Sequence, residues 1–135
     1  MSYGAGAALQ AAIYQRLVAD SALDALVSGA IYDSIPPGTP PGTYVSIGPE
    51  EARDASDQVG RGATHDFTVS VVTDQAGFQN AKTVAATVSD ALTGATLILA
   101  RGRLVGLWFV SARARRVEKA DVRRIDLRFR ARIED

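Results

Sequence analysis

The C-terminal segment 122–133 is the part of the sequence that most restricts the fold, because from Arg124 onward it alternates strictly between charged and apolar side chains. The apolar positions are Ile125, Leu127, Phe129, Ala131 and Ile133. The charged positions between them are Arg124, Asp126, Arg128, Arg130 and Arg132. Successive side chains of a β-strand point to opposite faces, so this pattern predicts a strand with one buried and one open face. Such a strand needs further elements to cover its apolar side.

Other segments predict further strands. Segment 64–73 alternates between an apolar face and a polar face. The first face carries His65, Phe67, Val69 and Val71, and the second carries Thr64, Asp66, Thr68 and Ser70. Segment 104–116 is apolar on both faces up to Val110, as expected of a central strand, and a turn at 118–121 joins it to the C-terminal strand. Shorter strands are predicted at 31–35, 44–47 and 97–99.

Three segments have helical periodicity. Segment 5–19 carries an apolar stripe. Segment 21–28 begins at Ser21, which is expected to cap the helix, and Gly29 is expected to end it. Segment 74–92 also carries an apolar stripe, and Gly94 is expected to end it. Long strands joined by short turns favour antiparallel pairing. The 135 residues are therefore expected to form a single α+β domain, residues 1–135, with a mainly antiparallel sheet and helices packed on one face.

Two connectors separate the first strands. Residues 36–42 contain four prolines and predict a stiff, extended surface segment. Residues 48–62 are polar and show no period, so they are expected to form a long loop. We expect this loop to be mobile in the free subunit and ordered in an assembly.

The residue types that most active sites need are scarce. The chain has no cysteine and one histidine, His65, so thiolate sites, cysteine nucleophiles and multi-histidine metal sites are excluded. His65 lies within a predicted strand and has no nucleophile motif near it, which favours an ordinary strand residue. The acidic group Glu50, Glu51, Asp54 and Asp57 lacks the spacing of a calcium loop. No catalytic, cofactor-binding or metal site is predicted, and the protein is not expected to be an enzyme.

Charge is distributed unevenly along a chain whose formal net charge is zero. Residues 1–60 hold two basic and seven acidic residues (2 − 7 = −5), and residues 61–135 hold thirteen basic and eight acidic residues (13 − 8 = +5). Such a polarised molecule could pack against copies of itself, although charged residues must lie on some surface in any case. The longest strongly apolar run, 104–110, is too short to span a bilayer, and no membrane partner is expected.

Arginines gather on the last two predicted strands. They are Arg113, Arg115, Arg124, Arg128, Arg130 and Arg132. Together they predict a basic sheet face, interrupted by Asp126 and Glu134, that could be solvated, meet another protein or attract nucleic acid. Aromatic residues for base stacking are not interleaved there. Trp108 and its neighbour Phe109 point to opposite faces of one strand, so one of them is expected to meet another subunit or a covering loop if the helices cover only one face.

Three blocks of the sequence resemble a known family. The blocks are AIYQRLVADSALDALVSGAIYDSIPPG at 12–38, HDFTVSVVTDQAGFQNAKTVAATVSDALTG at 65–94 and GRLVGLWFVSARARRVEKADVRRIDLRFRARIE at 102–134. In this order and spacing the chain resembles the tail terminator, or tail completion, proteins of long-tailed bacteriophages and gene transfer agents.

The resemblance implies a structural subunit of a ring, expected to be a hexamer, on the head-proximal end of a tail tube. The implied partners are further copies of the chain, the tail tube protein and a head connector or stopper protein. DNA would pass through the ring without sequence-specific binding, and assembly would occur in the bacterial cytoplasm. The alternatives are a head-side connector or stopper ring and a small nucleic-acid-binding module that uses the arginine-rich face.

Overall fold

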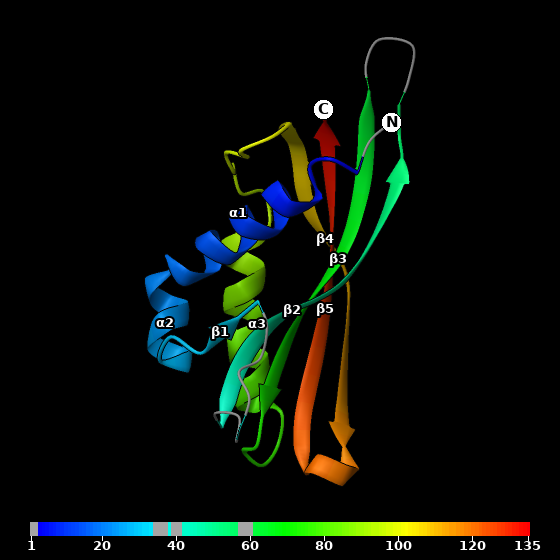
Figure 1. Cartoon of the computed structure of the whole chain (residues 1–135). Coiled ribbons are helices and arrows are strands. Elements are labelled where there is room, and N and C mark those ends of the chain that lie inside the picture. Colours follow the sequence, from blue (N-terminus) through cyan, green and yellow to red (C-terminus); the bar gives the residue numbers. More distant parts are fainter. Residues whose placement is uncertain (1–2, 34–37, 39–41, 57–60) are drawn as a thin grey trace.

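A computed structural model of the chain describes residues 3–33, 38, 42–56 and 61–135, and the elements below belong to these residues (Figure 1). The helices are α1 (Gly6–Val18), α2 (Ser21–Val27) and α3 (Gln79–Leu92), with a short 3₁₀ turn, η1 (Glu118–Ala120). The strands are β1 (Ile31–Tyr32), β2 (Thr43–Asp54), β3 (Gly62–Thr73), β4 (Arg103–Val117) and β5 (Val122–Glu134). The predicted α+β class is confirmed.

The strands form one sheet in the order β1-β2-β3-β5-β4. Only β1 and β2 are parallel, and every other neighbouring pair is antiparallel. β3 and β5 lie in the middle and pair along their whole lengths, from Gly62 opposite Glu134 to Thr73 opposite Arg123. The strands are long and twisted, and β2 and β3 extend together past the end of the helical layer (Figure 1).

The three helices cover one face of the sheet and bury the apolar sides of its strands (Figure 1). α1 contributes Leu9, Ile13 and Leu17, and α3 contributes Val84, Val88 and Leu92. They pack on the apolar side chains of the central strands, which are Phe67, Val69, Val71, Ile125, Leu127 and Phe129. The Phe67 and Phe129 rings stack with centroids 5.6 Å apart. The alternation of segment 122–133 therefore separates core from surface as predicted.

Most of the predicted loop at 48–62 is strand, so that prediction is wrong at both ends. β2 continues to Asp54 and β3 begins at Gly62, while residues 57–60 lie outside the described part. The sequence of β2 does not show a regular alternation for two reasons. A bulge between Ile47 and Glu50 shifts the register of the strand, and the half of the strand near Asp54 is mostly exposed. The change of this region on assembly remains a prediction.

The two edges of the sheet differ. β1 covers only Val45 and Ser46 of β2, and the uncovered part of that edge contains Pro49, which has no N–H to donate. β4 forms the other edge, so the prediction that 104–110 is a central strand is wrong. Four large apolar side chains on β4 are exposed as a result. They are Val105, Trp108, Phe109 and Val110.

Several element boundaries differ from the sequence prediction. The predicted strand 97–99 is an unpaired segment. The cap of α2 is Asp20, whose Oδ1 accepts a hydrogen bond from the Leu23 N–H, and not Ser21. α3 begins at Gln79 because a turn at Gly77, with φ of 75°, precedes it. Ile35 and most of the proline-rich connector lie outside the described residues.

Among the described residues, none of the helices is both long enough and apolar enough to cross a membrane.

Phe129 is the largest fully buried side chain of the described residues. It is fully buried and contacts the rings of Phe67 and Phe109. We expect Phe129→Ala to lower the free energy of unfolding by about 3–5 kcal/mol, because it leaves a cavity that these rings cannot fill. Val18→Ala, on an exposed part of α1, should change it by less than about 0.5 kcal/mol. Urea denaturation measures both, and similar losses would contradict this assignment of the core.

Candidate assembly interface

The face of the sheet opposite the helices carries a dense set of arginines, which we call the arginine face. Its members are Arg53, Arg113, Arg115, Arg124, Arg128, Arg130 and Arg132. Register places Arg115 beside Arg124 and Arg113 beside Asp126 across β4 and β5. Directly paired residues share a face, so the predicted basic sheet face exists. Trp108 lies on the same face, opposite Arg130.

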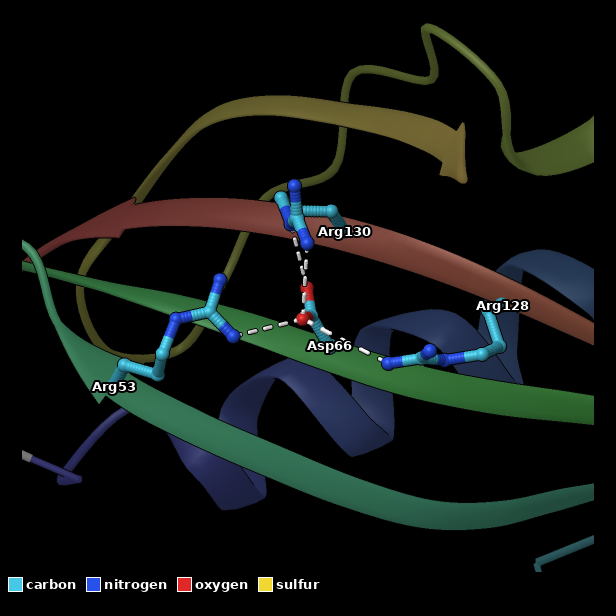
Figure 2. Close-up of polar contacts among 4 residues, drawn as sticks. All are labelled: Arg53, Asp66, Arg128 and Arg130. Atoms are coloured by element: carbon cyan, nitrogen blue, oxygen red, sulfur yellow. Dashed lines mark hydrogen bonds and ion pairs between the residues drawn. The ribbon is translucent and has the colours of Figure 1, made fainter. Parts of the chain in front are cut away.

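Asp66 on β3 is the centre of the first charge network on this face (Figure 2). Arg130 Nε lies 2.7 Å from Asp66 Oδ1, and its Nη2 lies 3.2 Å from Oδ2. Arg53 from β2 lies 2.9 Å from Oδ2, and Arg128 lies farther away at 3.9 Å. Three strands are thus cross-linked through one carboxylate that is only 5% exposed.

The guanidinium groups make Asp66 a much stronger acid than usual. The hydrogen bonds from Arg130 outweigh the effect of burial and, with those from Arg53, lower the pKa of Asp66 to about 2. The same contact raises the pKa of the Arg130 guanidinium. The pair is therefore ionised throughout the physiological pH range, and its geometry is bidentate, as arginine and carboxylate favour.

Asp126 on β5 is the centre of a second network. Ser70 donates a hydrogen bond of 2.6 Å to Asp126 Oδ1, and Arg124 Nε donates another of 2.9 Å. Arg115 lies 3.8 Å from Oδ2. Burial raises the pKa of Asp126, but the Ser70 hydroxyl and the two guanidinium groups outweigh it, so the pKa lies below its ordinary value.

A shallow hollow lies between the two networks. Arg113 and Arg128 line it together with Thr68, Ser111 and Pro49. Within the described part of the chain, neither Arg113 nor Arg132 forms an ion pair. The arginine face therefore combines fixed guanidinium groups with free ones, and Asp66 and Asp126 neutralise only part of its charge.

Sequence reasoning found six of these arginines but missed Arg53 and the role of Asp66. The sequence predicts a loop at Arg53, whereas β2 places its guanidinium group 2.9 Å from Asp66 Oδ2. The sequence puts Asp66 on the polar side of its strand, but it does not show that β3 pairs with β5. That pairing brings Asp66 directly opposite Arg130.

His65 occupies the buried face, next to Asp66 in sequence but on the opposite side of the sheet. Its side chain is fully buried, and its Nδ1 lies 3.4 Å from Glu50 Oε2. The Tyr3 ring stacks on it with centroids 6.0 Å apart, and Tyr3 donates a 2.6 Å hydrogen bond to Glu50 Oε1. This bond raises the pKa of the Tyr3 hydroxyl. The contacts tie the N-terminal segment to the β2–β3 hairpin.

His65 and Asp66 do not form a shared site, because their side chains lie on opposite faces of the sheet. Within the described residues, no three His, Cys, Asp or Glu side chains converge in a way that would hold a metal ion.

Comparisons with known proteins identify the family of the chain. The family model described as "Tail completion protein gp17" matches residues 11–134. A chain of the solved structure "Virion of native gene transfer agent (GTA) particle" is 66% identical, with a TM-score of 0.93. The alignment covers 99% of this chain and 100% of that chain. No curated protein sequence matches.

Fold, surface and comparisons together define the class of protein as a structural component of phage-type tails. A surface of fixed and free charges suits such a component, since its function is to bind other subunits. Within this class, the chain belongs to the tail completion protein gp17 family.

The depressed pKa of Asp66 predicts how stability depends on pH. Folding lowers the pKa of Asp66 from its ordinary value of 3.8 to about 2. The ionised carboxylate therefore contributes its full stabilisation to the fold above about pH 5. This stabilisation is lost as the pH falls through 4 toward 2. We expect Asp66→Asn to lower the free energy of unfolding by about 2 kcal/mol at pH 7 and by much less near pH 2.

Urea denaturation at both pH values measures this difference. Asp90→Asn is the matched control, because Asp90 lies on an exposed part of α3 and should show little effect at either pH. A loss for Asp66→Asn that is equal at the two pH values would refute the assignment.

Proposed function

We propose that six copies of this protein form a ring that caps the head-proximal end of a phage-like tail tube. The ring ends tube growth and joins the tube to the head connector or stopper protein. DNA passes through its centre without sequence-specific binding, and the ring assembles in the bacterial cytoplasm. The observation that carries the proposal is the full-length similarity to a chain of a gene transfer agent virion, together with membership of the tail completion family.

The arginine face supplies contact residues for this function. We assign ring or tube contacts to Arg113, Arg115, Arg124, Arg128, Arg130, Arg132 and Trp108. Arg130 and Arg124 are held by carboxylates of their own chain, so they present a preorganised surface. Arg113 and Arg132 have no such partner in the described residues and are available to acidic groups of another subunit.

The uneven charge of the chain supports a ring. A ring needs two different surfaces that fit each other on successive copies. The N-terminal 60 residues carry a net charge of −5 and the remaining residues +5, so opposite charges are available for such a contact.

Removal of the gene from the producing strain tests the proposal directly. We expect electron microscopy to show free heads beside detached tails of uncontrolled length, because nothing would end tube growth or join the tail. Restoring the gene should restore joined particles. Normal joined particles in the deletion strain would refute the proposal, and normal tails with leaking heads would favour a head-side stopper ring.

Neutralisation of the free arginines tests their role. We expect Arg113→Gln combined with Arg132→Gln to reduce joined particles on the order of tenfold, because two charged contacts between subunits are lost. Lys82→Gln combined with Lys119→Gln removes the same charge outside the arginine face and should have little effect. Particle counts measure both variants, and equal counts would contradict the assignment.

DNA binding by the free subunit tests the alternative function of a nucleic-acid-binding module. If the arginine face bound DNA, the free subunit would bind it with an affinity that falls steeply with salt. The partial neutralisation by Asp66 and Asp126 disfavours this reading.

A further inference from the structure

The two sides of the sheet carry opposite charge among the described residues. On the arginine face, seven arginines stand against three carboxylates (7 − 3 = +4), which are Glu51, Asp66 and Asp126. The Arg103–Glu134 ion pair on the same side adds no net charge. On the helical side, two basic residues, Arg16 and Lys82, stand against four carboxylates (2 − 4 = −2). These are Asp20, Asp24, Asp33 and Asp90. Opposite charges on opposite sides favour front-to-back packing of successive copies.

Each side also holds charged groups that lack a partner. Within the part of the chain that the structure describes, Arg113 and Arg132 form no ion pair. The same holds for Asp24 of α2 and Asp90 of α3, whereas Asp20 lies 3.8 Å from Arg16. Cations on one side and carboxylates on the other are thus available to different neighbours.

The outer side of α2 can approach another surface closely. Leu23 and Val27 are buried against the core. At 3.6 residues per turn, the side opposite to them carries only small residues. They are Ser21, Ala22 and Ala25. Asp24 and Leu26 lie on the two flanks of this side, and Leu26 is 38% exposed. α2 therefore presents a carboxylate and an apolar side chain on either side of a flat strip.

Trp108 and Arg113 present the complementary groups on the arginine face. They lie opposite Arg130 and Asp126 of β5, and Trp108 is 43% exposed. These two β5 positions are four residues apart, so the two groups are about 13 Å apart along the strands. The seven residues of α2 span about 10 Å, which fits this distance. Tryptophan and arginine are also the residues that most often dominate binding energy at interfaces.

The edges of the sheet are less suitable for a contact between copies. At the β4 edge, Gly94 N–H already donates to Leu107 O at 2.9 Å. The register of β4 also shifts between Leu104 and Gly106 and again between Phe109 and Ser111. At the other edge, β1 and Pro49 interrupt β2. Neither edge offers a continuous ladder to a second chain, so the faces of the sheet remain for this contact.

We propose that α2 of one copy packs on the arginine face of the next copy, with Asp24 paired to Arg113 and Leu26 against the Trp108 ring. The inference rests on the proposed ring, because it assigns the contact by which successive copies join. The two surfaces differ and lie on opposite sides of one chain, so each copy uses both and the contacts continue in one direction. In a ring closed in this way, the arginine face meets the neighbouring subunit and does not line the channel.

Exchange of the two charges tests the contact in intact particles. We expect Arg113→Asp and Asp24→Arg each to reduce joined particles at least about tenfold, because each variant places two like charges at the contact. The chain that carries both substitutions should recover to within about threefold of the unchanged protein, because the pair is restored with reversed polarity.

Arg113→Asp combined with Asp90→Arg is the matched control. It should show no recovery, because Asp90 lies on α3, outside the contact. Melting temperatures of the free subunits check that each variant folds. Normal particle counts for either single variant, or a charge-exchanged chain that is no better than the single variants, would overturn the inference. A loss confined to Arg113→Asp would overturn it as well, since the arginine face would then bind a different protein.

Cysteine crosslinking tests the same contact without changing its charges. Ala25→Cys and Ser111→Cys in one chain place one thiol on the outer side of α2 and another between Trp108 and Arg113. The chain has no other cysteine, and the two positions lie on opposite sides of the sheet, so they cannot join within one chain.

In oxidised particles we expect a ladder of bands that extends above the dimer, because each copy is linked to the next. Each single cysteine variant should give only the monomer band. The absence of a ladder would overturn the inference, as would a disulfide-linked dimer of the Ser111→Cys variant alone, which would show two arginine faces in contact.

These outcomes are separate from the failure of the proposed function. If deletion of the gene blocks joining but the two cysteines give no ladder, only the inference on the contact fails. If deletion leaves joined particles normal, the proposed ring fails as well.

Discussion

The pairing of β3 with β5 is the constraint on which the rest of the structure depends. Twelve residue pairs align the two strands so that Ala63, Phe67, Val69 and Val71 each lie opposite an apolar side chain of β5 on the core side. The same register brings Asp66 opposite Arg130 on the other side. A shift by one residue would expose Phe67 and Phe129 and bury several arginines, so this register is fixed by both faces at once. The helices then cover the apolar face, and the arginine face remains open for other chains.

Local pattern was enough to predict the helices, the C-terminal strand and the α+β class, since each depends on one periodic segment. It failed where pairing decides the structure. The sequence predicts a loop in the half of β2 that precedes Asp54, because its polar side chains lie at an exposed edge. It predicts a central strand at 104–110, because apolar residues face both sides, although β4 is an edge strand. The same limit applies to the site. Six arginines could be found by composition and alternation, but Asp66 and Arg53 join them only through contacts between distant strands.

The charge networks explain how a sheet can present so many arginines without losing stability. Asp66 and Asp126 hold Arg130, Arg53 and Arg124 by hydrogen bonds, and these contacts lower the pKa of both carboxyl groups. Arginine suits this arrangement better than lysine, because its planar group can bind a carboxylate and still expose other N–H donors. These three guanidinium groups are thereby held in place before any partner arrives, which reduces the entropy that they lose on assembly.

Pro49 limits the contacts that the β2 edge can form with another chain. The β2 edge cannot accept a full ladder of hydrogen bonds, because this residue has no N–H and lies beside a bulge. Another chain therefore cannot extend the sheet along the whole of this edge. Sheets of separate molecules cannot join through a continuous ladder at β2, so any contact between copies has to use other surfaces.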